Sequence, residues 1–285
     1  MMQKKRYIAG LLALLVACTM LLAGCVTPQP STSVPGGTNA TVPSTQNPAT
    51  VPTTDPTVEP TAEPTEPTQE SIPAPTEGPA PEEGTAEYYM QVVYAQQIQR
   101  YSAALTQQWN DAECSSNGVS PLLAQYYAGN AMDNVGVGFV DFENDDSWEL
   151  IIGAVQNSEN DPLVFEIWTL IDGEPQMVAQ SDAQNRYYLQ YSEEDALWYV
   201  AWESTRSQEH YGVHFLMLQN GMFEMVQAIV YDAAANPAEP WFMAFDTDMD
   251  TSNDERIDEM TAMAILQVNR NLYCAAEYAV FSSIN

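Results

Sequence analysis

Large apolar side chains recur every three or four positions near residue 100, a spacing that predicts one buried face of a helix. They are Tyr94, Ile98, Tyr101, Leu105 and Trp109. Asn110 and Asp111 are expected to end this helix, and a loop is expected through residues 114–118. Pro121 suits the first turn of a second, short helix over residues 121–127.

The middle of the chain carries short runs of β-branched and aromatic residues that predict strands. The runs cover residues 135–140, 148–152, 163–171, 176–179, 186–191, 197–202, 211–218, 222–231 and 241–245. Asp172-Gly173 and Asn220-Gly221 each separate two of these runs, and such dipeptides favour tight hairpin turns. Successive strands joined in this way predict an antiparallel meander.

A second helix is predicted near the end of the sequence. Residues 252–255, Ser-Asn-Asp-Glu, match a capping box that begins a helix. Helical spacing then continues through Ile257, Met260, Ala264, Val268 and Leu272. The predicted fold class is therefore α+β: an antiparallel β-meander sheet flanked by N- and C-terminal helices, in a single globular domain over residues 87–285.

A basic stretch followed by an apolar one opens the sequence. Lys4, Lys5 and Arg6 precede a mostly apolar run, residues 8–22, that is too short to span a membrane and fits a signal peptide. The run ends in Leu22-Ala23-Gly24-Cys25, which resembles the lipobox of bacterial lipoproteins. This resemblance implies cleavage after residue 24 and acyl chains such as palmitate on Cys25, which give stable anchoring. An ordinary signal peptide cut nearby is the alternative.

Residues 25–86 are predicted to comprise the lipidated cysteine and a disordered linker. The segment holds 14 of the 19 prolines, many threonines and eight acids, and it has too few apolar side chains to offset the entropy of ordering. Extended proline-rich chain of this length reaches roughly 190 Å at ~3.1 Å per residue. Such a reach favours display through a thick cell wall of the Gram-positive type, from the outer face of the cytoplasmic membrane.

The charge of the chain narrows the class of partner. The formal net charge is −31, and beyond residue 24 no lysine remains, so that five arginines face 39 acids, a balance of −34. This balance excludes nucleic acid, because phosphate backbones bind proteins that neutralise them. Cations and basic proteins are the natural counterparts. Solubility at a crowded surface and adaptation to salt account for the same charge.

One loop between predicted strands carries oxygen-bearing side chains at alternate positions: Asp141, Glu143, Asp145, Ser147 and Glu149. Calcium takes about six to eight oxygen ligands, and this spacing turns such groups toward one centre, with Ser147 offering its backbone carbonyl. The loop is therefore a candidate calcium site, and a solvated acidic turn is the alternative. A second acidic run, residues 246–254, has the same spacing, although the predicted capping box already accounts for its end.

The first loop resembles the calcium loops of FG-GAP and VCBS-type repeats, and residues 135–231 are similar to a group of uncharacterised Firmicutes surface lipoproteins. In that group an acidic loop precedes a strand and a hairpin, whose counterpart here is the segment from Phe165 to Gly173. The resemblance implies a cell-surface domain without an assigned activity. This chain departs from the group at Glu143, which is longer than the usual Asp, and at Asp146, which replaces a glycine suited to positive φ.

Other residue types with distinctive chemistry are few. His210 and His214 are the only histidines, and because a strand is predicted there they lack the helical pitch that suits zinc. Cys114 and Cys274 remain after Cys18 and Cys25 are accounted for, and both a disulfide and two buried free thiols stay open. The aromatic residues between positions 168 and 211 form either sheet core or a glycan-binding face.

These features predict a membrane-anchored, surface-displayed domain that binds or interacts without catalysis, with calcium as a stabilising ion. The expected ligand lies outside the cell, and a glycan and a basic protein both fit. A cell-wall or glycan-acting hydrolase with paired carboxylates is the rival class, and a purely structural surface module is a third. Serine-hydrolase, zinc-protease and phosphate-loop motifs are missing from the sequence, which favours a non-enzymatic role.

Overall fold

The computed structural model describes residues 80–155 and 162–284. From residue 80 onward the described residues belong to one compact unit. The predicted signal peptide, the lipidation site Cys25 and most of the predicted linker lie outside the described residues. Within the described part of the chain, no helix is long and apolar enough to cross a membrane.

The helix predicted near residue 100 is present. It comprises α2 (Ala86–Tyr88), a π-helical turn η1 (Tyr89–Val93) and α3 (Ala95–Gln107). The residues that the spacing marked are buried at Tyr94, Ile98, Tyr101 and Leu105. The chain then leaves α3 through Gln108, which has a left-handed backbone with φ of 51°.

The loop predicted after residue 110 is wrong, because the chain forms a further helix, α4 (Asp111–Ser116). The Asn110 side chain accepts hydrogen bonds from the backbone N–H groups of Ala112 and Glu113, and the Glu113 carboxylate accepts one from the backbone N–H of Asn110. This reciprocal capping box starts α4 where the sequence analysis placed a stop. The 3₁₀ helix η2 (Pro121–Tyr126) and α5 (Ala131–Asn134) follow.

Strands make up most of the remaining chain. They are β1 (Val135–Val140), β2 (Glu149–Ala154), β3 (Leu163–Ile171), β4 (Glu174–Gln180), β5 (Asn185–Ser192), β6 (Leu197–Ser207), β7 (His210–Gln219), β8 (Met222–Asp232), β9 (Trp241–Ala244), β10 (Glu255–Arg256), β11 (Tyr273–Cys274) and β12 (Ala279–Val280). The two predicted hairpin turns connect β3 to β4 and β7 to β8, with positive φ at Asp172 and Asn220.

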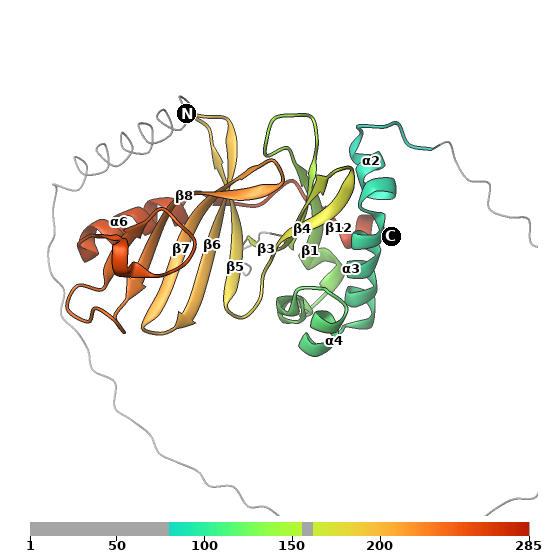
Figure 1. Ribbon diagram of the computed structural model, residues 1–285. Helices are drawn as coiled ribbons and strands as arrows, with labels where there is room; N and C mark the ends of the chain where they lie inside the picture. The colour runs from blue at the N-terminus through green and yellow to red at the C-terminus, as the bar shows by residue number, and fades with distance from the viewer. Residues whose placement is uncertain (1–79, 156–161, 285) are drawn as a thin grey trace, which may run out of the picture. The chain divides into compact units, whose positions relative to one another are not determined.

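The strands form one antiparallel sheet in the order β10-β9-β8-β7-β6-β5-β3-β2-β1-β12 (Figure 1). Strands β5 to β9 follow the predicted meander, and β10, which was not predicted, continues it beyond β9. Strand β4 departs from it, because β5 pairs with Leu163 and Val164 at the start of β3 and leaves the rest of that edge to β4. The domain is thus mostly an antiparallel sheet with a few helices, broadly α+β.

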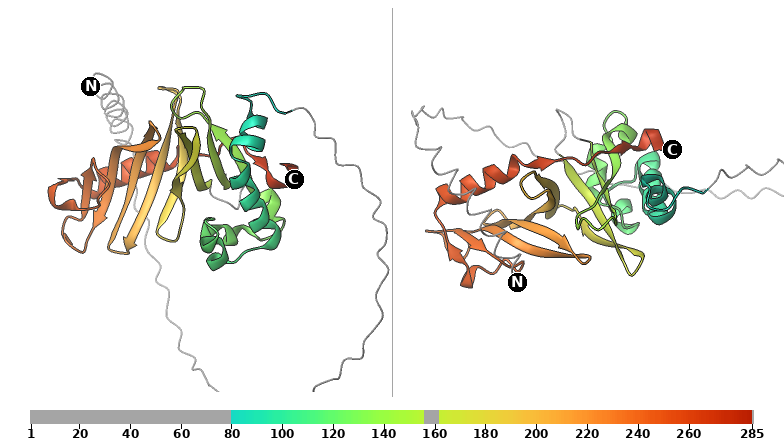
Figure 2. Two further views of the ribbon diagram at one scale, coloured as in Figure 1. Left: turned by 45° about the vertical axis from the view of Figure 1, so that its right-hand side comes forward. Right: turned by 90° about the horizontal axis from the view of Figure 1, so that it is seen from above.

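Helices at the two ends of the sheet share one core (Figure 2). At the β1–β3 end, Tyr101 of α3 packs near Phe165 and Phe281. At the other end, α6 (Glu259–Arg270) contributes Ala262, Ile265 and Leu266 to the same cluster of buried residues. A short final helix, α7 (Phe281–Ile284), ends the described chain.

The predicted start of the C-terminal helix at residues 252–255 is wrong. Those residues belong to the 3₁₀ helix η3 (Thr251–Asn253) and to β10, which extends the sheet beside β9. The true N-cap of α6 is Asp258, whose carboxylate accepts a hydrogen bond from the backbone N–H of Thr261. The helix buries Ala262, Ile265 and Leu266 instead of the predicted face, and Met260 is 78 % exposed.

Glycines of β1 and β2 leave space for Tyr278 on the face of the sheet opposite the core that the helices share. A Cβ atom at Gly136 would lie 2.6 Å from the Cβ of Tyr278, and one at Gly153 would lie 2.9 Å from its Cζ. Real Cβ atoms do not approach so closely. The glycines of this strand pair therefore allow the C-terminal segment to lie against the sheet before β12 pairs with β1.

Candidate functional site

The acidic loop between β1 and β2 is shaped by its own carboxylates. Asp141 accepts hydrogen bonds from the backbone N–H groups of Asp145 and Asp146, each at 3.1 Å, and Asp145 accepts one from Ser147 at 2.9 Å. Asp146 has φ of 64°, as expected for a position that related loops give to glycine. Local hydrogen bonds and two left-handed residues, Asn144 and Asp146, therefore fix the turn.

The two glutamates of this loop are engaged elsewhere. The Glu143 carboxylate accepts hydrogen bonds from the backbone N–H groups of Asn220 and Gly221, at 2.8 and 3.3 Å, in the distant β7–β8 turn. Glu149 is 2 % exposed, and its carboxylate accepts hydrogen bonds from the Phe142 N–H and the Thr169 hydroxyl. Burial raises the pKa of Glu149 to about 7.

The five predicted calcium ligands do not converge in this arrangement. Within the described residues, no three His, Cys, Asp or Glu side chains are grouped closely enough to hold a metal ion. The Glu143 carboxylate is bonded to the β7–β8 turn, and the Glu149 carboxylate is bonded to Thr169 in the core. Both glutamates therefore hold hydrogen bonds outside the turn that Asp141 and Asp145 form.

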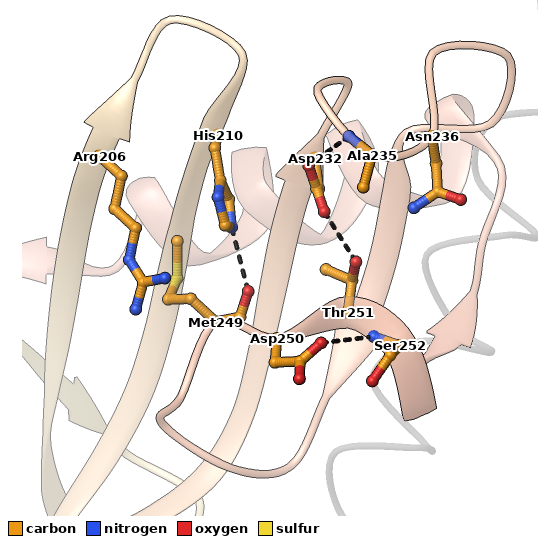
Figure 3. Close-up of a pocket in the computed structure, with 9 residues that line it drawn as sticks. All are labelled: Arg206, His210, Asp232, Ala235, Asn236, Met249, Asp250, Thr251 and Ser252. Carbon is orange, nitrogen blue, oxygen red and sulfur yellow. Dashed lines mark hydrogen bonds between the residues drawn. The ribbon is translucent and has the colours of Figure 1, made fainter.

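A different arrangement brings polar groups together at the other end of the sheet. The chain that follows β9 forms a strap, residues 246–252, that includes the start of η3 and passes across β7 and β8 (Figure 3). The Asp248 carbonyl accepts a hydrogen bond from Arg206 Nη2 at 2.9 Å, and the Met249 carbonyl lies 3.0 Å from His210 Nε2. These contacts tie the strap to the ends of β6 and β7.

Met249 fixes the centre of the strap. This residue is 3 % exposed, and its Sδ lies 3.1 Å from Nε2 of His214. Gly212 leaves the space that the thioether occupies, since a Cβ there would lie 3.1 Å from Sδ. Met249 has φ of 63°, a strained conformation for a side chain of this size, so the surrounding contacts must hold it.

A pocket of about 470 Å³ lies beside the strap, within the size range of ~300–1,000 Å³ that is usual for small-molecule sites. Arg206 and His210 line it from β6 and β7, and Asp232, Ala235 and Asn236 line it from the end of β8 and the loop that follows. The strap and η3 supply the remaining wall, Met249 to Ser252 (Figure 3).

Charges of both signs line this pocket. Arg206 is exposed, while Asp232 is 5 % exposed and accepts hydrogen bonds from the Ala235 N–H at 3.0 Å and the Thr251 hydroxyl at 2.8 Å. Asp250 accepts a hydrogen bond from the Ser252 N–H, which lowers the pKa of Asp250. A ligand in the pocket would meet a basic group and two carboxylates.

The aromatic residues of the sheet are mainly core. Tyr187, Trp202 and His214 stack in register across β5, β6 and β7, with ring centroids 6.2 and 4.3 Å apart, but His214 is fully buried and the other two rings are half-buried. Tyr191 is more exposed, and its ring is tilted by 52° from that of Trp198. Neither group forms a flat, open platform of the kind that stacks on sugar rings.

Two buried glutamates have raised pKa values, and neither lines the pocket. Glu149 lies beneath the acidic loop, and Glu166 lies beneath α3, where burial raises its pKa. They serve separate parts of the core. The structure therefore does not bring them together as the acid and base of a hydrolase.

Both cysteines of the domain are free thiols. Cys114 is buried beside Tyr127, while Cys274 contacts the Leu189 carbonyl and belongs to the cluster on the other face of the sheet. Burial raises the pKa of each thiol, which makes them poor nucleophiles.

Comparisons of the chain with protein-family models, with curated proteins and with solved structures find no match. The proposed function therefore rests on the geometry of the strap pocket. The sequence pattern drew attention to His210 and to the acidic run of the strap separately, and no pattern marked Arg206, Asp232 or Asn236. The one available signal was Met249, a lone apolar residue within an acidic run.

Proposed function

We propose that this protein is an exported, lipid-anchored surface protein whose domain binds a small polar ligand in the strap pocket. The observation that carries the proposal is the pocket itself, in which side chains from β6, β7, β8 and the strap converge. The strap has a single strained, buried residue at its centre, Met249, and such strain is typical of functional positions. The signal sequence and lipobox support the location outside the cell.

Blocking the pocket tests this proposal. The chain without its signal and lipid, residues 26–285, is titrated with a set of small polar metabolites while its backbone amide NMR signals are followed. We expect signal shifts at Arg206, His210 and Ser252. The Ser252→Trp variant should abolish them by filling the pocket.

Ser116→Trp is the matched control, because Ser116 is an exposed serine on α4 and does not line the pocket. This variant should bind as the unmodified chain does. Shifts that persist in Ser252→Trp, or that gather at another surface, would place the ligand elsewhere and reject the strap pocket as the binding site.

Calcium binding by the acidic loop is a second proposal, and it carries a structural condition. Glu143 and Glu149 must give up their present hydrogen bonds before they can join Asp141, Asp145 and Ser147 around an ion. Support comes from the resemblance to calcium loops and from the left-handed Asp146. Thermal melts with calcium and with a chelator test it, and Glu149→Gln should remove any rise in Tm. Coinciding melts of the unmodified chain would contradict the proposal.

A further inference from the structure

The strap pocket presents a basic end and an acidic end to the same small volume. A bulge in β6 lies at Arg206, and Arg206 and His210 contact the neighbouring strap carbonyls of Asp248 and Met249. Asp232 and Asn236 lie on the far side of His210 from Arg206, and Asp250 lies on the strap (Figure 3). The charge of the pocket lining is therefore positive on the side of Arg206 and negative on the side of Asp232 and Asp250.

The basic end has donors to spare. A guanidinium carries five N–H groups in a planar fork that suits a carboxylate. In Arg206 the structure assigns one contact, from Nη2 to the Asp248 carbonyl at 2.9 Å. That contact orients the guanidinium at the pocket wall and leaves other donors directed at solvent or at a bound group.

The acidic end has acceptor capacity to spare. Each oxygen of a carboxylate offers two lone-pair sites. The Asp232 oxygens each accept one hydrogen bond, from the Ala235 N–H and from the Thr251 hydroxyl, and the carboxylate lines the pocket floor. Asp250 is exposed and uses one oxygen to cap η3. A positively charged donor that enters the pocket would find these acceptors already held in place.

We propose that the ligand of this pocket is a small zwitterion, whose carboxylate contacts Arg206 and whose ammonium group contacts Asp232 and Asp250. This inference rests on the proposed function. An anion alone would be repelled by a chain with 39 acids and only five arginines beyond residue 24. A cation alone would face Arg206. A ligand with both charges satisfies each end of the pocket, as amino acids and short peptides do.

Three related probes separate the charges. Alanine carries both, N-acetylalanine lacks the ammonium group, and alaninamide lacks the carboxylate. Titrated into residues 26–285 and followed by NMR, alanine should bind about tenfold or more tightly than either analogue, because each charged contact that is lost removes a charge-assisted hydrogen bond.

Two conservative variants assign the ends. Arg206→Gln should weaken the binding of alanine by a larger factor than the binding of alaninamide, because only alanine loses a charged contact. Asp250→Asn keeps an oxygen that can cap η3, so it should weaken alanine while N-acetylalanine binds as before. Ser252→Trp should remove all binding, and Ser116→Trp should remove none.

The outcomes separate this inference from the proposed function. Equal binding of N-acetylalanine would make the pocket an anion site, and equal binding of alaninamide would make it a cation site; either result overturns the zwitterion. If none of the three probes binds while other metabolites still shift the pocket signals, the zwitterion is overturned and the proposed function stands. If nothing shifts those signals, both fail.

Discussion

At the scale of single residues, His214 makes stability depend on pH. Burial, with a smaller effect from Arg206, lowers the pKa of His214 to about 4. In the unfolded chain a histidine titrates near ~6.5, so between these values the unfolded state holds the proton more tightly. His214 should therefore lower the free energy of unfolding as pH falls from about 6.5 toward 4, by about 3 kcal/mol at most, and have no such effect above that window.

The measurement is urea unfolding of the unmodified chain and of His214→Gln at several pH values between 4 and 7.5. The stability difference between the two proteins should change across the window, with the unmodified chain losing more as pH falls. The raised pKa of Glu149 acts in the opposite direction, toward lower stability as pH rises through about 7, and it cancels because both proteins share it. A difference that stays constant with pH would contradict the account of His214.

Gly153 supplies a second prediction at this scale. An added Cβ would meet the Tyr278 ring at 2.9 Å, so Gly153→Ala should destabilise the domain by about 1–3 kcal/mol through overpacking. In a Tyr278→Ala background the same substitution should cost clearly less. Urea unfolding of the four proteins gives the coupling, and an equal cost in both backgrounds would show that Tyr278 does not impose the glycine.

Single residues also show which details of the structure could be predicted from the sequence. The positive φ of Asp146 could be predicted because the loop pattern names the position of a glycine. The contacts of Glu143 with Asn220 and Gly221 could not, because spacing within a loop says nothing about a turn 77 positions away. Local geometry follows from local sequence, whereas the partner of a long side chain depends on the assembled sheet.

At the scale of elements, helix and strand periods predicted most of the chain, and the failures have local causes. The two hairpin dipeptides give turns where expected, and α3 buries the expected face. The C-terminal helix was placed too early because residues 252–255 and Asp258 both offer a cap, and pairing of β10 with β9 decides between them. A tertiary contact of this kind leaves no mark on the local pattern.

The contact between α3 and β3 gives a prediction at the scale of elements. The Glu166 side chain is fully buried and accepts hydrogen bonds from Arg100 Nη2 at 3.2 Å, Trp168 Nε1 at 2.7 Å and Gln180 Nε2 at 2.9 Å. Arg100→Met leaves that carboxylate without its counter-charge, so it should cost about 3 kcal/mol. Arg100→Met combined with Glu166→Met should recover part of the loss, because no buried charge then remains.

An exposed ion pair gives the matched control. Arg256 contacts Glu239 at 2.9 Å with more than half of each side chain exposed, so Arg256→Met should cost no more than about 1 kcal/mol. Urea unfolding at neutral pH compares the variants. Equal losses for Arg100→Met and Arg256→Met would contradict a buried role for the Arg100–Glu166 pair.

At the scale of the whole molecule, the strap pocket shows why function was harder to predict than fold. Arg206, Asp232 and Asp250 are spread over more than forty positions, and no motif links them. Each has a local explanation, as a strand end, a turn acceptor or a helix cap. Only the antiparallel order of β6, β7 and β8, with the strap laid across them, makes them neighbours.

The placement of the protein in the cell is a whole-molecule prediction that turns on one atom, the sulfur of Cys25. In the proposed anchor, two acyl chains on this sulfur would bury enough methylene groups for stable attachment, whereas the chain beyond residue 24, with its balance of −34, should be repelled by an anionic surface. Cys25→Ser should therefore move the protein from the membrane fraction to the medium and abolish labelling by palmitate. Cys18→Ser should do neither, because Cys18 lies within the segment that the predicted cleavage removes.

The released Cys25→Ser protein should keep the Tm of the unmodified domain, since the compact unit lies wholly beyond residue 78. Membrane attachment and label that survive in Cys25→Ser, or are lost in Cys18→Ser, would place the anchor elsewhere.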